Sequence, residues 1–93
     1  MNKQNRQNIS YSMISVGFKN MVARNRIVAV ISPHSRPVRI LINEAKNGNK
    51  LVDATLGKKT KSVVVMDSDH VVLSSNTVDT ITQRIQDSNF DDE

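Results

Sequence analysis

The residues of this chain that could perform acid–base or nucleophilic chemistry are few and widely separated. The two histidines, His34 and His70, belong to no metal-binding or nucleophile motif, and His70 fits a turn or edge role. There is no cysteine, which excludes thiolate chemistry and disulfides. Asp67 and Asp69 could bind a cation, but carboxylates in a tight turn usually satisfy the turn backbone. We therefore expect no enzyme, no metal site, no cofactor and no small-molecule substrate.

Residues 57–60 faintly resemble a phosphate-binding loop. That motif requires a first glycine five positions before the second, and Ser or Thr directly after the lysine. In this chain Val52 stands where the first glycine is required, and Lys59 stands where Ser or Thr is required. The segment is therefore not a nucleotide-binding loop.

Basic side chains gather instead at predicted turns and strand ends. Three lysines fall within four residues of a predicted turn, two arginines precede a predicted strand, and another lysine lies in a second turn. Loops often carry binding residues, lysine neutralises phosphates, and arginine can also read guanine edges or a narrow minor groove. The alternative is a solvated basic surface without a ligand. The candidate contacts are Lys19, Arg24, Arg26, Lys58, Lys59 and Lys61.

The charge of the chain is uneven. The net charge is +4, but residues 1–86 carry 13 basic and five acidic side chains, a net of +8, because the end of the chain is acidic. Such a bias favours a polyanionic partner. The only aromatic residues, Tyr11, Phe18 and Phe90, offer few stacking platforms for single strands. Double-stranded DNA fits better.

We expect one domain over residues 13–87, between a mobile extension (1–12) and an acidic disordered tail (88–93). No stretch has transmembrane length, and no apolar run follows the first basic residues. These features predict a cytoplasmic protein with no membrane partner.

The hydrophobic pattern predicts strands at 13–18, 21–22, 27–31, 51–54, 63–66 and 71–73, with a helix after the third and another after the sixth. This is an α+β domain with a small antiparallel sheet and two helices. We expect two hairpins that share strand 63–66, with the lysine turn at the tip of the first. The valine runs do not alternate with polar residues, so both sheet faces should be buried. If the two helices cover one face, either a neighbouring subunit or the first strands cover the other.

Capping residues delimit the helices. Ser35 and Pro37 suit the start of the first helix and Gly48 its end, while Asn76 can cap the second. Ile40 lies roughly 200° from Val38 around the first helix, away from its apolar face. An exposed isoleucine on so small a domain suggests an interface.

Several segments together resemble the RemA family, the extracellular matrix regulatory proteins of bacteria. They are Ile14-Ser-Val-Gly-Phe, Asn25-Arg26-Ile27, Ser32-Pro33, Asp53-Ala54-Thr55-x-Gly57 and Val63-Val-Val-Met-Asp-Ser-Asp-His70-Val, within a match over about residues 13–85. The resemblance implies a LytTR-like domain in a ring-shaped homo-oligomer. It also implies an activator of biofilm-matrix and osmolyte genes that binds double-stranded DNA.

The resemblance places DNA contacts at Arg26, Lys58 and Lys59 and a structurally sensitive proline at Pro37. The chain departs from the family pattern at three positions: Lys58-Lys59 replaces a usual arginine pair, Lys19 a glycine and Leu56 an aromatic residue. Lysine lacks the donor fork of arginine, so phosphate contact is the expected role of the pair.

Our interpretation is therefore a DNA-binding regulator that acts as a homo-oligomer, with Arg36, Pro37 and Ile40 at the oligomer interface. The alternative is a ring-forming adaptor that binds a protein partner, its basic loop being only a solvated surface.

Overall fold

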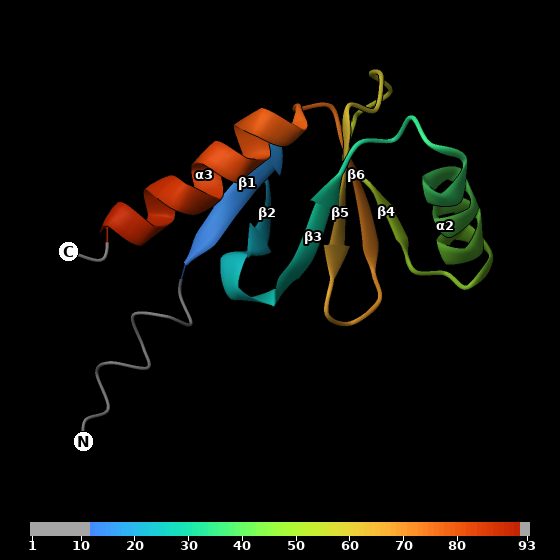
Figure 1. Cartoon of the computed structure of the whole chain (residues 1–93), viewed down its shortest axis with the longest axis horizontal. Coiled ribbons are helices and arrows are strands. Elements are labelled where there is room, and N and C mark those ends of the chain that lie inside the picture. The colour runs from blue at the N-terminus through green and yellow to red at the C-terminus, as the bar shows by residue number, and fades with distance from the viewer. Residues whose placement is uncertain (1–11, 92–93) are drawn as a thin grey trace.

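The computed structural model describes residues 12–91, and its order of strands and helices agrees with the sequence prediction. The class is α+β with two helices, as predicted (Figure 1). The elements are β1 (Met13–Gly17), β2 (Asn20–Ala23), the 3₁₀ helix η1 (Arg24–Arg26), β3 (Ile27–Ile31), α2 (Arg36–Asn47), β4 (Leu51–Asp53), β5 (Ser62–Met66), β6 (Val71–Ser74) and α3 (Val78–Asp91).

The main sheet is mixed, which corrects the prediction of a purely antiparallel one. Its order is β3-β5-β6-β4, and β4 runs parallel to β6, while β1 and β2 form a separate hairpin. The connection from β4 to β5 crosses the end of β6. There Ala54 N donates to Leu73 O at 2.9 Å and Lys61 N donates to Ser74 O at 2.8 Å. The lysine turn therefore belongs to a crossover loop, and the predicted hairpin between residues 51–54 and 63–66 is wrong.

Each face of this sheet has its own core. On one face, Val64 and Val72 pack with Ile14 and Val16 of β1 and with Ile81 of α3. On the other face, Val63, Val71 and Leu73 pack with Ala45 of α2. Figure 1 shows α3 over β1 and β2 on one side of the molecule and α2 beside β4 on the other. The helices thus cover opposite faces, and the expectation that both lie on one face is wrong. The first strands do fold over the sheet, but on the same face as α3.

The ends of α2 follow the predicted capping chemistry. Ser35 Oγ accepts a hydrogen bond from Val38 N at 3.4 Å, Pro37 lies in the first turn, and Gly48 caps the end. Ile40 is 48% exposed, as its position on the helix predicts.

The start of α3 differs from the prediction by one residue. Thr77, not Asn76, caps this helix, because Thr80 N donates to Thr77 Oγ1 at 3.2 Å. Asn76 Oδ1 instead accepts from Arg84 Nη1 at 2.9 Å, which ties the first turns of α3 to the preceding loop.

The helix continues to Asp91, so residues 88–91 are helical where the sequence predicts a disordered tail. Residues 92–93 and the predicted extension, apart from Ser12, lie outside the described residues. Neither helix within residues 12–91 combines the length and apolarity needed to span a bilayer.

Candidate nucleic-acid interface

The crossover loop that carries the lysines is fixed at its base by Asp53 and Thr55. Asp53 Oδ1 accepts hydrogen bonds from Thr55 Oγ1 at 2.6 Å and from Thr55 N at 3.0 Å. The hydroxyl and then the N–H of Thr55 stabilise the carboxylate and lower the pKa of Asp53 below its ordinary value, against a small opposing effect of burial. Thr55 O then accepts from Lys58 N at 3.0 Å. The backbone is held in place while the side chains of Lys58, Lys59 and Lys61 remain exposed.

The β1–β2 turn lies at the same end of the sheet as this loop. Ser74 Oγ donates to Val16 O at 2.8 Å, and Ser74 O accepts from Lys61 N at 2.8 Å, so the bases of the two segments meet at one residue. Lys19, in the β1–β2 turn, is exposed as well. We call this group the lysine end; its members are Lys19, Lys58, Lys59 and Lys61.

Arg24 and Arg26 lie at the opposite end of the sheet. Arg26 O accepts from Asp67 N, at the far end of β5 from Lys61. At ~3.4 Å per residue, the strand and its flanking residues separate Lys61 from Asp67 by about 20 Å. In Figure 1 the crossover loop is at the top of the sheet and η1 is at the bottom. One chain therefore does not bring the predicted arginine and lysine contacts together.

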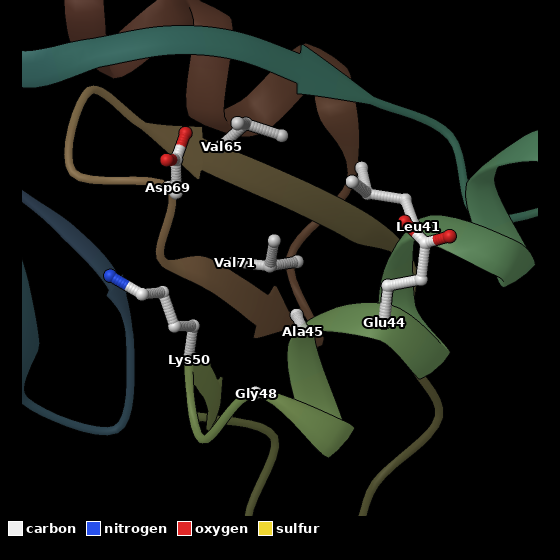
Figure 2. A pocket seen from close by; sticks show the side chains of 8 residues that line it. All are labelled: Leu41, Glu44, Ala45, Gly48, Lys50, Val65, Asp69 and Val71. Atoms are coloured by element: carbon white, nitrogen blue, oxygen red, sulfur yellow. The ribbon is translucent and has the colours of Figure 1, made fainter.

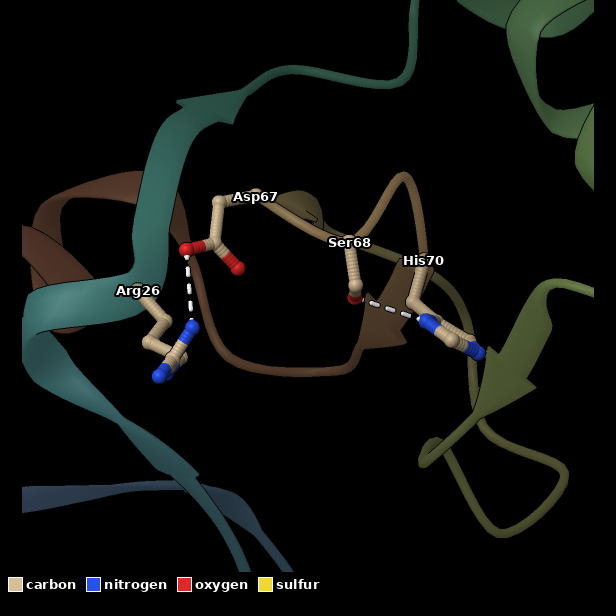
Figure 3. Close-up of polar contacts among 4 residues, drawn as sticks. All are labelled: Arg26, Asp67, Ser68 and His70. Carbon is tan, nitrogen blue, oxygen red and sulfur yellow. Dashed lines mark hydrogen bonds and ion pairs between the residues drawn. The ribbon is translucent and has the colours of Figure 1, made fainter.

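The two arginines differ in environment. Arg26 Nη1 forms an ion pair with Asp67 Oδ2 at 3.2 Å (Figure 3), and the two side chains are 66% and 45% exposed. Exposed pairs of this kind contribute only about 0–1 kcal/mol, so a phosphate can replace the carboxylate. Arg24 is partly buried, and its Nη2 donates to Ser12 Oγ at 3.2 Å. Arg24 thus supports the start of β1, and Arg26 presents its charge to solvent.

The histidine nearest this pair has a local role. His70 Nδ1 lies 2.7 Å from Ser68 Oγ within the β5–β6 turn (Figure 3). Among the described residues no group of three or more His, Asp or Glu side chains could hold a metal ion.

A cavity of about 300 Å³ opens on the α2 face of the sheet, which the sequence did not predict. Val65 and Val71 contribute apolar wall, and Figure 2 shows Lys50 and Asp69 on one side of it and Glu44 on the other. The Lys50 ammonium donates to Ser68 O at 3.3 Å. Neither histidine lines the cavity, so no imidazole base is positioned there. The cavity forms because α2 packs against this part of the sheet. Hydrophobic periodicity does not predict which strands a helix packs against, so the sequence gives no sign of the cavity.

Comparison with known proteins gives one consistent family. The model of the RemA-like family, described as extracellular matrix regulatory protein A-like, matches residues 13–85. A relative from Oceanobacillus iheyensis is 47% identical over 77 residues, which are 83% of this chain and 90% of the relative. A relative from Natranaerobius thermophilus is 44% identical over 86 residues, 91% of this chain and 97% of the relative. One from Dictyoglomus turgidum is 47% identical over 81 residues, 87% and 95% of the two chains. All three are named as regulatory proteins.

Proposed function

Because this chain belongs to the RemA-like family of regulatory proteins, we propose that it is a transcriptional regulator that binds double-stranded DNA through the lysine end. The observation that carries the proposal is the position of four exposed lysines at one end of the sheet, where hydrogen bonds to Ser74 join their two segments. Among the described residues none of these lysines forms an ion pair with a carboxylate. Their charges are available to phosphates, and each phosphate neutralised releases counterions and strengthens binding at low salt.

The proposed active form is a ring-shaped homo-oligomer. Arg26 and the lysine end lie too far apart to share one phosphate cluster on a single chain, whereas neighbouring copies can bring them together. Within residues 12–91, the two outer strands of the main sheet, β3 and β4, each pair with another strand on one side only. Each exposes a valine: Val28 is 66% and Val52 is 46% exposed. Contact between two different edges is heterologous, and repetition of such a contact with closure gives a ring.

The helix beside the β4 edge extends this proposed interface. Arg36 and Pro37 in the first turn of α2 are exposed, and Ile40 is 48% exposed on the same helix. An exposed apolar residue on a helix beside an unpaired strand edge is suited to contact with a second copy. We place the oligomer interface there and at the β4 edge. The family resemblance further suggests that the domain is LytTR-like. It also suggests that the protein activates the genes for biofilm matrix and osmolytes.

The direct test compares two lysine pairs. In the first variant Lys58→Ala and Lys59→Ala remove charge from the lysine end, and in the control Lys46→Ala and Lys50→Ala remove the same charge near the other end of the sheet. DNA affinity is measured by fluorescence anisotropy on a duplex over a range of salt concentrations. The first pair should weaken binding to all sequences and flatten the salt slope by roughly 1 for each phosphate that is no longer neutralised. The control pair should bind almost as the unmodified protein does.

Equal affinity and slope for the folded, oligomeric Lys58/Lys59 variant would contradict the proposal. Binding to a protein partner that does not respond to salt, with no DNA binding, would favour the adaptor function instead.

A further inference from the structure

Two turns at the lysine end have the same unusual backbone. In the β1–β2 turn Phe18 and Lys19 have φ of 53° and 67°, and in the crossover loop Leu56 and Gly57 have φ of 55° and 82°. Positive φ at both central positions is typical of type I′ turns, which favour Gly, Asn and Asp. Here the first central residue of each turn is large and apolar. Such side chains are strained in this conformation because Cβ approaches the backbone closely.

The same two side chains project into solvent. Leu56 is 72% exposed and Phe18 is 45% exposed, and neither belongs to either core cluster. The open space around the tip of the crossover loop extends to Gly57, where a Cβ would meet no atom within 4 Å. Core packing therefore does not explain why an apolar residue occupies a position that Asn or Gly would fill with less strain.

The scaffold around both turns is rigid enough to maintain the strain. The Asp53–Thr55 hydrogen bonds fix the crossover loop directly before Leu56. In the other turn, Asn20 Nδ2 donates to Gly17 O at 3.0 Å. Strained residues persist where the surrounding structure holds them, and they concentrate at ligand contacts.

We infer that Leu56 and Phe18 are apolar DNA contacts that enter a groove between the phosphates bound by the neighbouring lysines. The inference rests on the proposed function and adds a second kind of contact to it. Lysine–phosphate contacts position a protein on the duplex. Leucine and phenylalanine are among the side chains that minor-groove proteins insert against base steps. In each turn the exposed apolar side chain can contact the bases, and the lysine that follows it can contact a phosphate. The two kinds of contact therefore lie side by side on one surface.

The test is Leu56→Asn in the full-length chain. Asparagine adopts positive φ more readily than leucine, so the thermal midpoint of the variant should rise. Its affinity for duplex DNA should nevertheless fall by about tenfold or more, because the leucine side chain is no longer there to be buried against the bases. The salt slope should stay the same, because no phosphate contact is removed. Phe18→Asn should likewise lower DNA affinity without changing the slope.

Two further variants make the result specific. Leu56→Phe retains an apolar side chain and should keep most of the DNA affinity. Met13→Gln replaces an exposed apolar residue, 47% exposed at the start of β1, and should leave binding unchanged. Light scattering checks that each variant has the oligomeric state of the unmodified protein.

The outcomes separate this inference from the proposed function. Unchanged affinity of Leu56→Asn and Phe18→Asn, with loss of binding in the Lys58→Ala, Lys59→Ala protein, would overturn the apolar contacts and leave the proposed function intact. Loss of the oligomer in Leu56→Asn would assign Leu56 to assembly and also overturn the inference. No duplex binding by the unmodified protein at low salt would overturn both.

Discussion

The hydroxyl of Ser74 donates a hydrogen bond to the carbonyl oxygen of Val16 over 2.8 Å, and both residues are buried. Val16 comes just before the β1–β2 turn, and Ser74 ends β6 beside the crossover loop. The same hydroxyl accepts from Asn76 N at 3.0 Å. One side chain therefore joins the β1–β2 hairpin, the main sheet and the approach to α3 at the proposed DNA-binding end.

Ser74→Ala should destabilise the protein, because it leaves the buried Val16 carbonyl without this donor. A buried polar group left unsatisfied costs about 1–3 kcal/mol. Ser62 is the matched control, since it pairs with Ser74 across the strands and is equally buried. The Ser62 hydroxyl has no hydrogen-bond partner within the described part of the chain, so Ser62→Ala should be neutral or slightly stabilising.

Urea denaturation of the two alanine variants measures the stability change at each serine. The midpoints can be compared directly if the m-values are unchanged. Equal stability losses for the two alanine variants would show that the Ser74–Val16 hydrogen bond contributes nothing of its own.

Local chemistry made some features of the fold predictable. Ser35, Pro37 and Gly48 determine the ends of α2 through contacts within the helix and its caps, and such signals can be read from the sequence. The start of α3 was missed by one residue because Asn76 bonds to Arg84, eight positions ahead. The contact between Asn76 and Arg84 forms only once the helix has folded, so it cannot be read from the sequence. With the Asn76 side chain engaged there, Thr77 caps the helix instead.

Topology was less accessible from sequence. The three residues of β4 contain no pattern that distinguishes pairing with β5 from parallel pairing with β6. The distance between the lysine loop and Arg26 comes from a different pairing, because β3 runs antiparallel to β5 and places Ile27 opposite Met66, at the end of β5 remote from Lys61. Lys58 and Lys59 were predictable as exposed basic residues, but their separation from Arg26 follows from strand order and register, which periodicity does not determine.

The Asp53–Thr55 hydrogen bonds predict a pH dependence of stability. The pKa of Asp53 is lowered in the folded chain by the Thr55 hydroxyl and N–H. The stabilisation is therefore fully present above the ordinary aspartate pKa of ~3.9 and is lost as the pH falls through the lowered value. Asp53→Asn keeps an acceptor oxygen but removes the charge. The variant should be less stable than the unmodified protein at pH 7, and the difference should shrink as the pH falls below ~3.9.

Thermal unfolding at several pH values measures this effect, and Thr55→Val, which removes the hydroxyl donor, should weaken the same pH dependence. A difference between Asp53→Asn and the unmodified protein that stays constant down to pH ~2 would mean that the charge of Asp53 is not involved.

The ion pair between Arg26 and Asp67 predicts opposite effects of two substitutions. If a phosphate replaces Asp67 as the partner of Arg26, Asp67→Asn should raise DNA affinity by roughly several-fold at low salt, since it removes the carboxylate that competes with the phosphate for Arg26. Arg26→Lys should bind more weakly despite its retained charge, because the planar donor fork is absent. Asp69→Asn, in the same turn, controls for general loss of negative charge.

Affinities are compared on AT-rich and GC-rich duplexes. Equal binding of Arg26→Lys and the unmodified protein on every duplex would show that Arg26 is at most a point charge.

The last prediction links assembly to DNA binding. A single chain with a few basic contacts should bind duplex DNA with a dissociation constant of only about 10⁻⁴ to 10⁻⁶ M at physiological salt. Several copies of the lysine end on one assembly can raise the avidity by roughly 10²–10⁴ if they reach the duplex together. Pro37→Ser frees the backbone at the start of α2, and Ile40→Asp places a charge at the exposed apolar position beside Arg36. Neither substitution removes a basic residue.

Both variants should keep the circular dichroism spectrum of the folded chain, lose the large species in light scattering, and lose DNA binding in parallel. Ile40→Val should retain assembly, because it keeps an apolar contact. Gln86→Asp puts the same new charge on an exposed position of α3 and should also assemble and bind. A Pro37→Ser or Ile40→Asp protein that is monomeric yet binds duplex DNA with undiminished affinity would separate assembly from binding. In that case the lysine end of a single chain would suffice for recognition.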